Sequence, residues 1–220
     1  MRTLSLLEAR VLGVLVEKAH TVPDSYPLSL NALTLGCNQK TARDPVLAAS
    51  EGEVQAAADA LKQLSLAFES SGSRVSRYEH NLGRVLGLPS QSVALLAVLM
   101  LRGPQTTSEL RANCERLHRF ADLSAVEGFL EELAARADEK GGPLAVRLAR
   151  APGSREARWA QLLTGALSAA SLATAADGED FVAVSELAAL KSRLAIAEAE
   201  ITALRSLVDR LYAELDIPRT

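Results

Sequence analysis

A short polar run, NQKTARD at positions 38–44, is the segment of this chain best equipped for recognition chemistry. Its amides can pair with base edges, and its two cations can hold a phosphate or an acidic side chain. A structural role is the alternative, because Asn38 can end a helix and Arg43 can pair with Asp44 or Asp24. The candidate nucleic-acid-binding residues of this run are Asn38, Gln39, Lys40 and Arg43.

Arginines gather in a second region. This region comprises the strand-like segment 144–162 and the short polar segment at 107–119. Since duplex DNA is a polyanion, arginines beside a hairpin turn are suited to contact its phosphates. The alternative is that arginines on an edge hairpin are solvated and prevent pairing with another strand. The candidate contacts of this region are Arg111, Arg147, Arg150, Arg155 and Arg158, with Arg116 and Arg119 nearby.

The side chains that usually perform catalysis or bind metals do not form a recognisable pattern. The three histidines lack metal-ligand spacing, and the sequence contains no phosphate-binding glycine loop or Gly-x-Ser-x-Gly motif. Cys37 and Cys114 each follow a leucine by four residues, which is typical of small core residues. We therefore expect no catalytic residue, no metal and no cofactor, and an enzyme is the least favoured class of protein.

The elements that must position these residues occur twice along the chain. Each copy contains an apolar helix, a short polar helix, a longer amphipathic helix and two alternating strands around a small-residue turn. Three helices and a hairpin predict a winged helix-turn-helix, with Gly72 and Pro152-Gly153 in the wing turns. The first copy has helices at 6–18, at 29–37 and after Ser50, with strands in 66–80; the second has helices at 93–102, at 107–114 and after Ser124, with strands in 144–162.

Helix starts support this division. A Ser or Thr followed three residues later by Glu forms a capping box, in which both side chains satisfy backbone N–H groups of the first turn. The predicted boxes are Ser5 with Glu8, Ser50 with Glu53, Thr106 with Glu109 and Ser124 with Glu127.

Length and composition fit a globular protein without a membrane segment. The chain has 220 residues, of which 48% are hydrophobic, and this is enough to build the cores of two small domains. It lacks both a long apolar run and the pattern of a secretory signal. We expect a cytoplasmic protein.

The last part of the chain has a different character. Residues 166–180 are rich in small side chains and are interpreted as a linker, whereas residues 181–217 carry apolar side chains at the 3-4 spacing of a coiled coil. This pattern predicts a parallel homodimer; the alternative is an amphipathic helix that folds back on the rest of the chain. The predicted dimerisation residues are Leu187, Leu190, Leu194, Ile201, Leu204, Val208, Leu211 and Leu215.

Charge argues against strong nucleic-acid binding. The net charge is −3, and the two repeats, residues 1–88 and 89–165, are each close to neutral, so neither has the basic excess of a typical DNA-binding domain. The third helix of a winged helix would enter the major groove, and carboxylates there repel phosphates. These carboxylates are Glu51, Glu53 and Asp59 in the first copy and Glu127, Glu131 and Glu132 in the second.

Several blocks of residues resemble those of the YceH-like family of uncharacterised bacterial proteins. The resemblance covers almost all of residues 4–165, with mild departures at Ala19-His20 and Thr41-Ala42. It implies two winged-helix domains, often followed by a coiled-coil tail, and it implies no established activity. The blocks are PDSYPLSLNAL at 23–33, CNQKTARDPV at 37–46, RYEH at 77–80, LMLRGPQTTSELR at 99–111 and PGSREARWAQLLTG at 152–165.

These observations predict an α+β protein, mainly α with small β hairpins. The expected domains are two tandem winged helices at 1–88 and 89–165, a linker at 166–180 and a coiled-coil helix at 181–217. We expect a non-enzymatic homodimer that binds double-stranded DNA as a transcriptional regulator. The alternative is a protein-interaction module resembling the winged-helix subunits of chromosome-segregation complexes. No membrane partner is expected.

Overall fold

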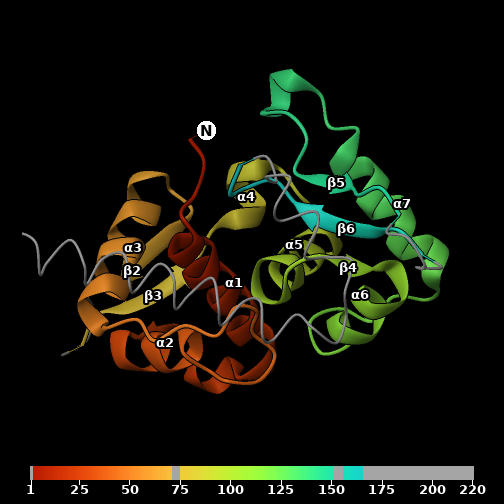
Figure 1. The fold of residues 1–220 in the computed structure, drawn as a ribbon. Helices are drawn as coiled ribbons and strands as arrows, with labels where there is room; N and C mark the ends of the chain where they lie inside the picture. The colour runs from red at the N-terminus through yellow and green to blue at the C-terminus, as the bar shows by residue number, and fades with distance from the viewer. Residues whose placement is uncertain (1, 71–74, 151–155, 166–220) are drawn as a thin grey trace, which may run out of the picture. The chain divides into compact units, whose positions relative to one another are not determined.

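The computed structural model describes residues 2–70, 75–150 and 156–165, all within one compact unit (Figure 1). Several predictions lie outside the described residues: the wing turns at Gly72 and Pro152-Gly153, Arg155, the linker 166–180 and the coiled-coil helix 181–217 with its dimerisation residues. Among the described residues no helix is both long and apolar enough to cross a membrane.

The first repeat, here called the first half, combines helices with one small sheet. The sheet is antiparallel, in the order β1-β3-β2, so that the hairpin β2–β3 is extended by a short strand that precedes α2. The elements are α1 (Leu6–Thr21), a 3-10 turn (Pro23–Ser25), β1 (Leu28–Ser29), α2 (Leu30–Cys37), α3 (Glu51–Gln63), β2 (Ala67–Ser70), β3 (Arg77–His80) and α4 (Leu82–Leu86).

The second half, residues 89–165, repeats this order of elements. Its sheet is again antiparallel and three-stranded, in the order β4-β6-β5, so the two halves share one topology. The elements are α5 (Ser90–Arg102), β4 (Gln105–Thr106), α6 (Thr107–Cys114), α7 (Leu123–Ala134), a 3-10 turn (Asp138–Lys140), β5 (Ala145–Arg147) and β6 (Arg158–Gln161). The expectation of a mixed fold with small antiparallel sheets is confirmed.

The helix caps confirm three of the four predicted capping boxes, those at Ser5, Ser50 and Thr106. The fourth prediction is wrong. Helix α7 begins after Asp122, whose carboxylate accepts from the Ala125 N–H at 2.8 Å. Ser124 instead lies inside the first turn and donates to that carboxylate at 2.8 Å. Aspartate is as good an N-cap as serine, and here the earlier of two candidates that are two residues apart starts the helix.

Helices α1 and α5 form the centre of the core and join the two halves. Residues 8–16 of α1 and 92–101 of α5 are buried on every side, as expected for helices whose sequences are mostly apolar, although α1 also buries Glu8 and Arg10. The two helices pack against each other (Figure 1). Gly13 permits this approach, because a Cβ at this position would lie 3.0 Å from the Leu101 side chain.

Candidate nucleic-acid interface

The polar run 38–44, here called the polar loop, begins at the end of α2. Asn38 is the C-cap residue of that helix. Its side-chain amide donates to the Ala49 carbonyl at 2.7 Å, and its side-chain oxygen accepts from the Ala49 N–H at 2.8 Å. Both ends of the amide are therefore used to hold the segment that leads into α3. This arrangement corresponds to the structural alternative for Asn38.

The next two residues of the polar loop remain accessible. Gln39 donates to the carbonyl of Thr41 at 3.0 Å, within the loop itself, and Lys40 is exposed. Ala42 then adopts a φ of 59°, in the left-handed region that side chains with a Cβ rarely occupy. This conformation turns the chain so that the next residue, Arg43, points inward.

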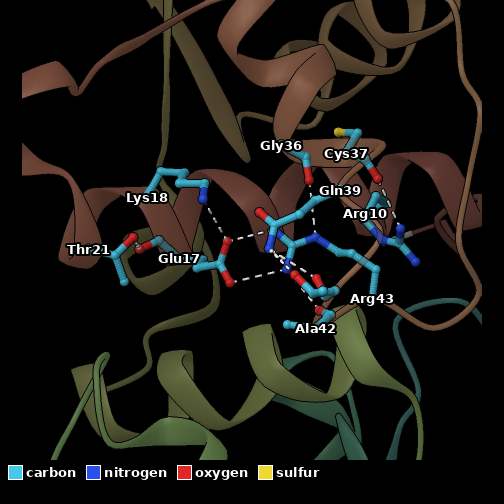
Figure 2. Close-up of polar contacts among 10 residues, drawn as sticks. Arg10, Glu17, Lys18, Thr21, Gly36, Cys37, Gln39, Ala42 and Arg43 are labelled. Atoms are coloured by element: carbon cyan, nitrogen blue, oxygen red, sulfur yellow. Dashed lines mark hydrogen bonds and ion pairs between the residues drawn. The ribbon is translucent and has the colours of Figure 1, made fainter.

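Arg43 lies in the interior rather than at the surface (Figure 2). Its side chain is 0% exposed, and its two terminal nitrogens donate to the Glu17 carboxylate at 3.1 and 2.6 Å. It also donates to the carbonyls of Gly36 at 3.0 Å and Ala42 at 2.8 Å. The ion-pair partner is thus Glu17 on α1, and not Asp44 or Asp24 as expected. A guanidinium buried in this way has no access to a phosphate.

A second buried guanidinium, that of Arg10 on α1, was missed by the sequence analysis. It donates to the carbonyls of Cys37 at 3.1 Å and Pro45 at 2.6 Å, and its residue is 0% exposed (Figure 2). Its Nε has no partner among the described residues. The signal in the sequence was an arginine inside the apolar run LLEARVLGVLVEK, where a cation needs internal acceptors.

The polar loop also contacts the second half. The backbone N–H of Asp44 donates to the carbonyl of Leu101 at 2.8 Å, one residue before α5 ends. Burial raises the pKa of Asp44, although the nearby charge of Arg10 opposes this. Arg10, Glu17 and Arg43 therefore fix a loop that connects α1, α2 and α5. Of the four candidate residues in the polar loop, Asn38 and Arg43 serve this junction, and Gln39 and Lys40 remain available to a ligand.

The arginines of the second half are divided between ion pairs and solvent. Arg147 lies 3.4 Å from the Glu127 carboxylate and 5.8 Å from the ring centroid of Trp159. Arg158 donates to the Pro104 carbonyl at 2.9 Å and lies 3.3 Å from Glu109. Arg150 is exposed. Arg147 and Arg158 therefore each lie beside a carboxylate.

A smaller basic group lies between α6 and α7. Arg111, on α6, donates to the Ala121 carbonyl at 3.1 Å and is exposed. Arg116 is also exposed, and the side chain of Arg119 is 84% exposed beside Glu115 at 3.6 Å. Arg111 thus belongs to α6, whereas Arg116 and Arg119 belong to the turn that leads into α7.

Carboxylates occupy the outer sides of the third helices, as the sequence predicts. In α3, Glu51 and Glu53 are exposed at the N-terminal end, and in α7, Glu131 and Glu132 are exposed further along. Asp59 is half-buried and accepts from Lys62 at 2.9 Å. A duplex placed along either helix would meet negative charge.

The cysteines and histidines show no sign of activation. Cys37 and Cys114 are buried, and this burial raises the pKa of each thiol to about 12. Burial lowers the pKa of His80 to about 4, so its imidazole is neutral near pH 7. Among the described residues no group of histidine, cysteine, aspartate and glutamate side chains has the geometry of a metal site.

Comparison with known proteins places the chain in a family. Residues 4–154 match the family described as "Protein of unknown function, DUF480", and the chain belongs to this family. The resemblance to an uncharacterised bacterial family is therefore confirmed.

Individual relatives match along nearly the whole chain. A "UPF0502 protein" of Paraburkholderia phytofirmans is 59% identical over 217 residues, which are 99% of this chain and 91% of the relative. A UPF0502 protein of Methylibium petroleiphilum is 64% identical over 203 residues, 91% of this chain and 85% of the relative. These names assign no activity.

Proposed function

We propose that the chain is a non-enzymatic tandem winged-helix protein that binds a partner protein. Each half has the helices and the hairpin that the winged helix-turn-helix requires, with a short strand before its second helix. We further propose a cytoplasmic location and a parallel coiled-coil homodimer formed by residues 181–217. Winged helices bind nucleic acid in some proteins and proteins in others, so the exposed surface must decide between the two partners.

The surface that supports a protein partner lies on the first half, where α2 meets the start of α3. Asn31 and Leu35 are four residues apart on α2 and share one face of that helix. Asn31 donates to the Glu51 carboxylate at 3.1 Å, so this face adjoins the N-terminal end of α3. We call Asn31, Leu35, Glu51 and Glu53 the α2–α3 surface.

The observation that carries the proposal is that Leu35, one helical turn after Asn31 on this surface, is 67% exposed. An exposed apolar side chain on a surface that also carries carboxylates is consistent with a protein interface, in which apolar and charged side chains occur together. The same arrangement is unsuited to DNA, because the carboxylates repel phosphates and a leucine side chain gains little beside them. The partner segment expected here carries lysine or arginine around an apolar side chain.

Double-stranded DNA is the second candidate partner. Its support is the exposed Arg150 near the turn of the second hairpin, together with Arg111 and Arg119 between α6 and α7. In this hypothesis the second half contacts the phosphates, and the acidic third helices stay away from the groove.

Affinity capture from nuclease-treated lysate, compared between variants, tests the proposal. Leu35→Ser/Glu51→Lys should lose the proteins that wild type retains, since burying a leucine contributes about 1.5–3 kcal/mol. Val85→Ser is the matched control, because Val85 is also an exposed apolar residue, at 38%, but lies on α4. Equal capture by all three proteins contradicts the proposal.

A gel-shift assay on duplex DNA tests the second candidate. DNA would be favoured over a protein partner by two results together. Wild type and Leu35→Ser/Glu51→Lys would both shift the duplex at low salt, and Arg150→Glu would not. The DNA hypothesis also requires a steep loss of affinity between roughly 50 and 200 mM salt, because each phosphate contact releases counterions.

A further inference from the structure

A hollow on the second half has no role in the proposed function. It lies between the outer face of α6 and the turn that enters α7, and its volume is about 690 Å³. We call it the α6–α7 hollow. Arg111 and Arg119 line it together with Glu115, Phe120 and Leu123, so it combines two cations and one carboxylate with apolar side chains.

The two arginines of the hollow retain most of their capacity to bind an anion. A guanidinium has five N–H donors, and among the described residues Arg111 donates one hydrogen bond, to the Ala121 carbonyl at 3.1 Å, with the Asp122 carboxylate close enough for its charge to be felt. The partner of Arg119 is Glu115 at 3.6 Å, and both side chains of this pair are largely exposed, at 84% and 64%. Exposed pairs of this kind are weak, so a carboxylate that binds both arginines can replace Glu115.

The apolar part of the hollow is already organised. Phe120 is buried, and its ring makes edge contacts with His118 and Phe129 at centroid distances of 4.7 and 6.0 Å. Leu123 is 43% exposed beside it. A ligand can therefore cover Leu123 with an apolar group while its anion reaches the arginines, and neither contact requires the protein to repack.

The first half lacks this combination of side chains at the equivalent place. When Leu33 and Cys37 are matched with Leu110 and Cys114, Arg111 corresponds to Thr34, which is buried and donates to the Leu30 carbonyl at 3.0 Å. The arginine at position 111 thus distinguishes the second half from the first at this place.

We propose that the α6–α7 hollow binds an acidic peptide segment of a partner protein, with an Asp or Glu carboxylate on Arg111 and Arg119 and an apolar side chain over Leu123. A peptide segment fits better than a duplex for two reasons. The site is concave and partly apolar, as pockets for side chains are. A duplex passing over it would also run along α7, where Glu131 and Glu132 are exposed, whereas a short segment ends before them.

The test is fluorescence anisotropy of the full-length protein with a labelled synthetic peptide in which Asp and Glu alternate with Leu and Phe. Saturable binding is expected, and Arg111→Ala/Arg119→Ala should weaken it at least tenfold, since each charge-assisted contact is worth about 1.5–3 kcal/mol. Arg84→Ala is the control, because Arg84 is exposed on α4, outside the hollow, and this variant should bind as wild type does.

Leu123→Ser distinguishes a lost contact with the peptide from a general loss of stability. Leu123 is exposed, and its replacement leaves the Arg111–Ala121 hydrogen bond in place. This variant should weaken the acidic peptide and leave the melting temperature unchanged. The site is separate from the α2–α3 surface, so Leu35→Ser should leave peptide binding intact even where it abolishes capture of the other partner. Absence of saturable binding, equal binding by the arginine variant, or preference for a labelled DNA duplex that is lost in that variant would overturn the proposal.

Discussion

Replacement of Glu17 by glutamine should destabilise the protein more than its partly accessible position suggests. The Glu17 carboxylate is 16% exposed, but the Arg43 side chain that it binds is 0% exposed. Glutamine is nearly isosteric and removes the negative charge, which leaves a buried guanidinium without its counter-ion. Removing one partner of a buried pair costs about 3–5 kcal/mol. Because Arg43 keeps its bonds to two backbone carbonyls, we expect a loss of about 2–3 kcal/mol in the free energy of unfolding.

Urea unfolding of the full-length chain, followed by circular dichroism at pH 7, measures this loss. Glu115→Gln is the matched control, because it removes the same charge from an exposed pair in which Glu115 is 64% exposed and Arg119 is 84% exposed. Exposed pairs contribute up to about 1 kcal/mol, so the control should stay below that value. If the two substitutions cost the same free energy, the buried pair does not organise the junction and the reasoning fails.

The pH dependence of the same pair gives an independent check. Burial by itself would raise the pKa of Glu17, but the hydrogen bonds and charge of Arg43, together with those of Lys18, more than offset burial, so the pKa lies below its ordinary value. A carboxylate with a depressed folded-state pKa stabilises the protein above its unfolded-state pKa, about 4.3, and the contribution is lost as the pH falls through the folded-state value. The stability difference between wild type and Glu17→Gln should therefore shrink below about pH 4.3. A difference that grows on acidification would contradict this sign.

Three further predictions concern packing, thiol reactivity and assembly. Gly36→Ala should lower the free energy of unfolding in urea by about 1–3 kcal/mol, because its Cβ would lie 2.6 Å from a side-chain carbon of α1. Gly52→Ala is the control. Because open space surrounds Gly52, this variant should be neutral or slightly stabilising. The Cys37 and Cys114 thiols, each with a pKa of about 12, should react with iodoacetamide at pH 8 only after unfolding. Deletion of residues 166–220 should convert a dimer into a folded monomer in light scattering.

Each of these predictions has an outcome that excludes it. Equal stability of the two glycine variants would show that the contact between α1 and α2 can relax without cost. Fast alkylation of the native protein would show an accessible, activated thiol. If the full-length chain is monomeric, the predicted dimer does not form. If the truncated chain remains dimeric, the dimer interface lies outside residues 166–220.

Much of the fold followed from local rules that act over a few residues. Apolar spacing located the helices, and serine or threonine caps set the starts of α1, α3 and α6. The two-residue strands β1 and β4 were not predicted, because a strand of that length has no periodicity and exists only through its pairing with a distant strand. Helix α4 has five residues, again too few for a pattern.

The candidate site was harder to predict, because its residue types fit two opposite environments. Arg43 in a polar loop looks like a surface cation, and only the burial of Arg10 and the position of Glu17 on α1 show that it faces inward. These contacts span 26 to 35 residues of sequence, beyond the reach of any local motif. The repeat did indicate where the halves differ, since Thr34 and Arg111 are equivalent by sequence spacing alone.

The hydrogen bond between Asp44 and Leu101, with the packing of α1 on α5, has a consequence for how the two halves bind. These contacts join the halves through one core, so the separation of the α2–α3 surface and the α6–α7 hollow is set by the fold. A partner with a basic segment and an acidic segment could occupy both sites at once. Once the first segment is bound, the second has a high effective concentration at its own site, which raises the overall affinity. This gain requires that the distance between the two segments matches the separation of the sites. Selection between partners would then depend on the distance between their two segments as well as on the composition of each.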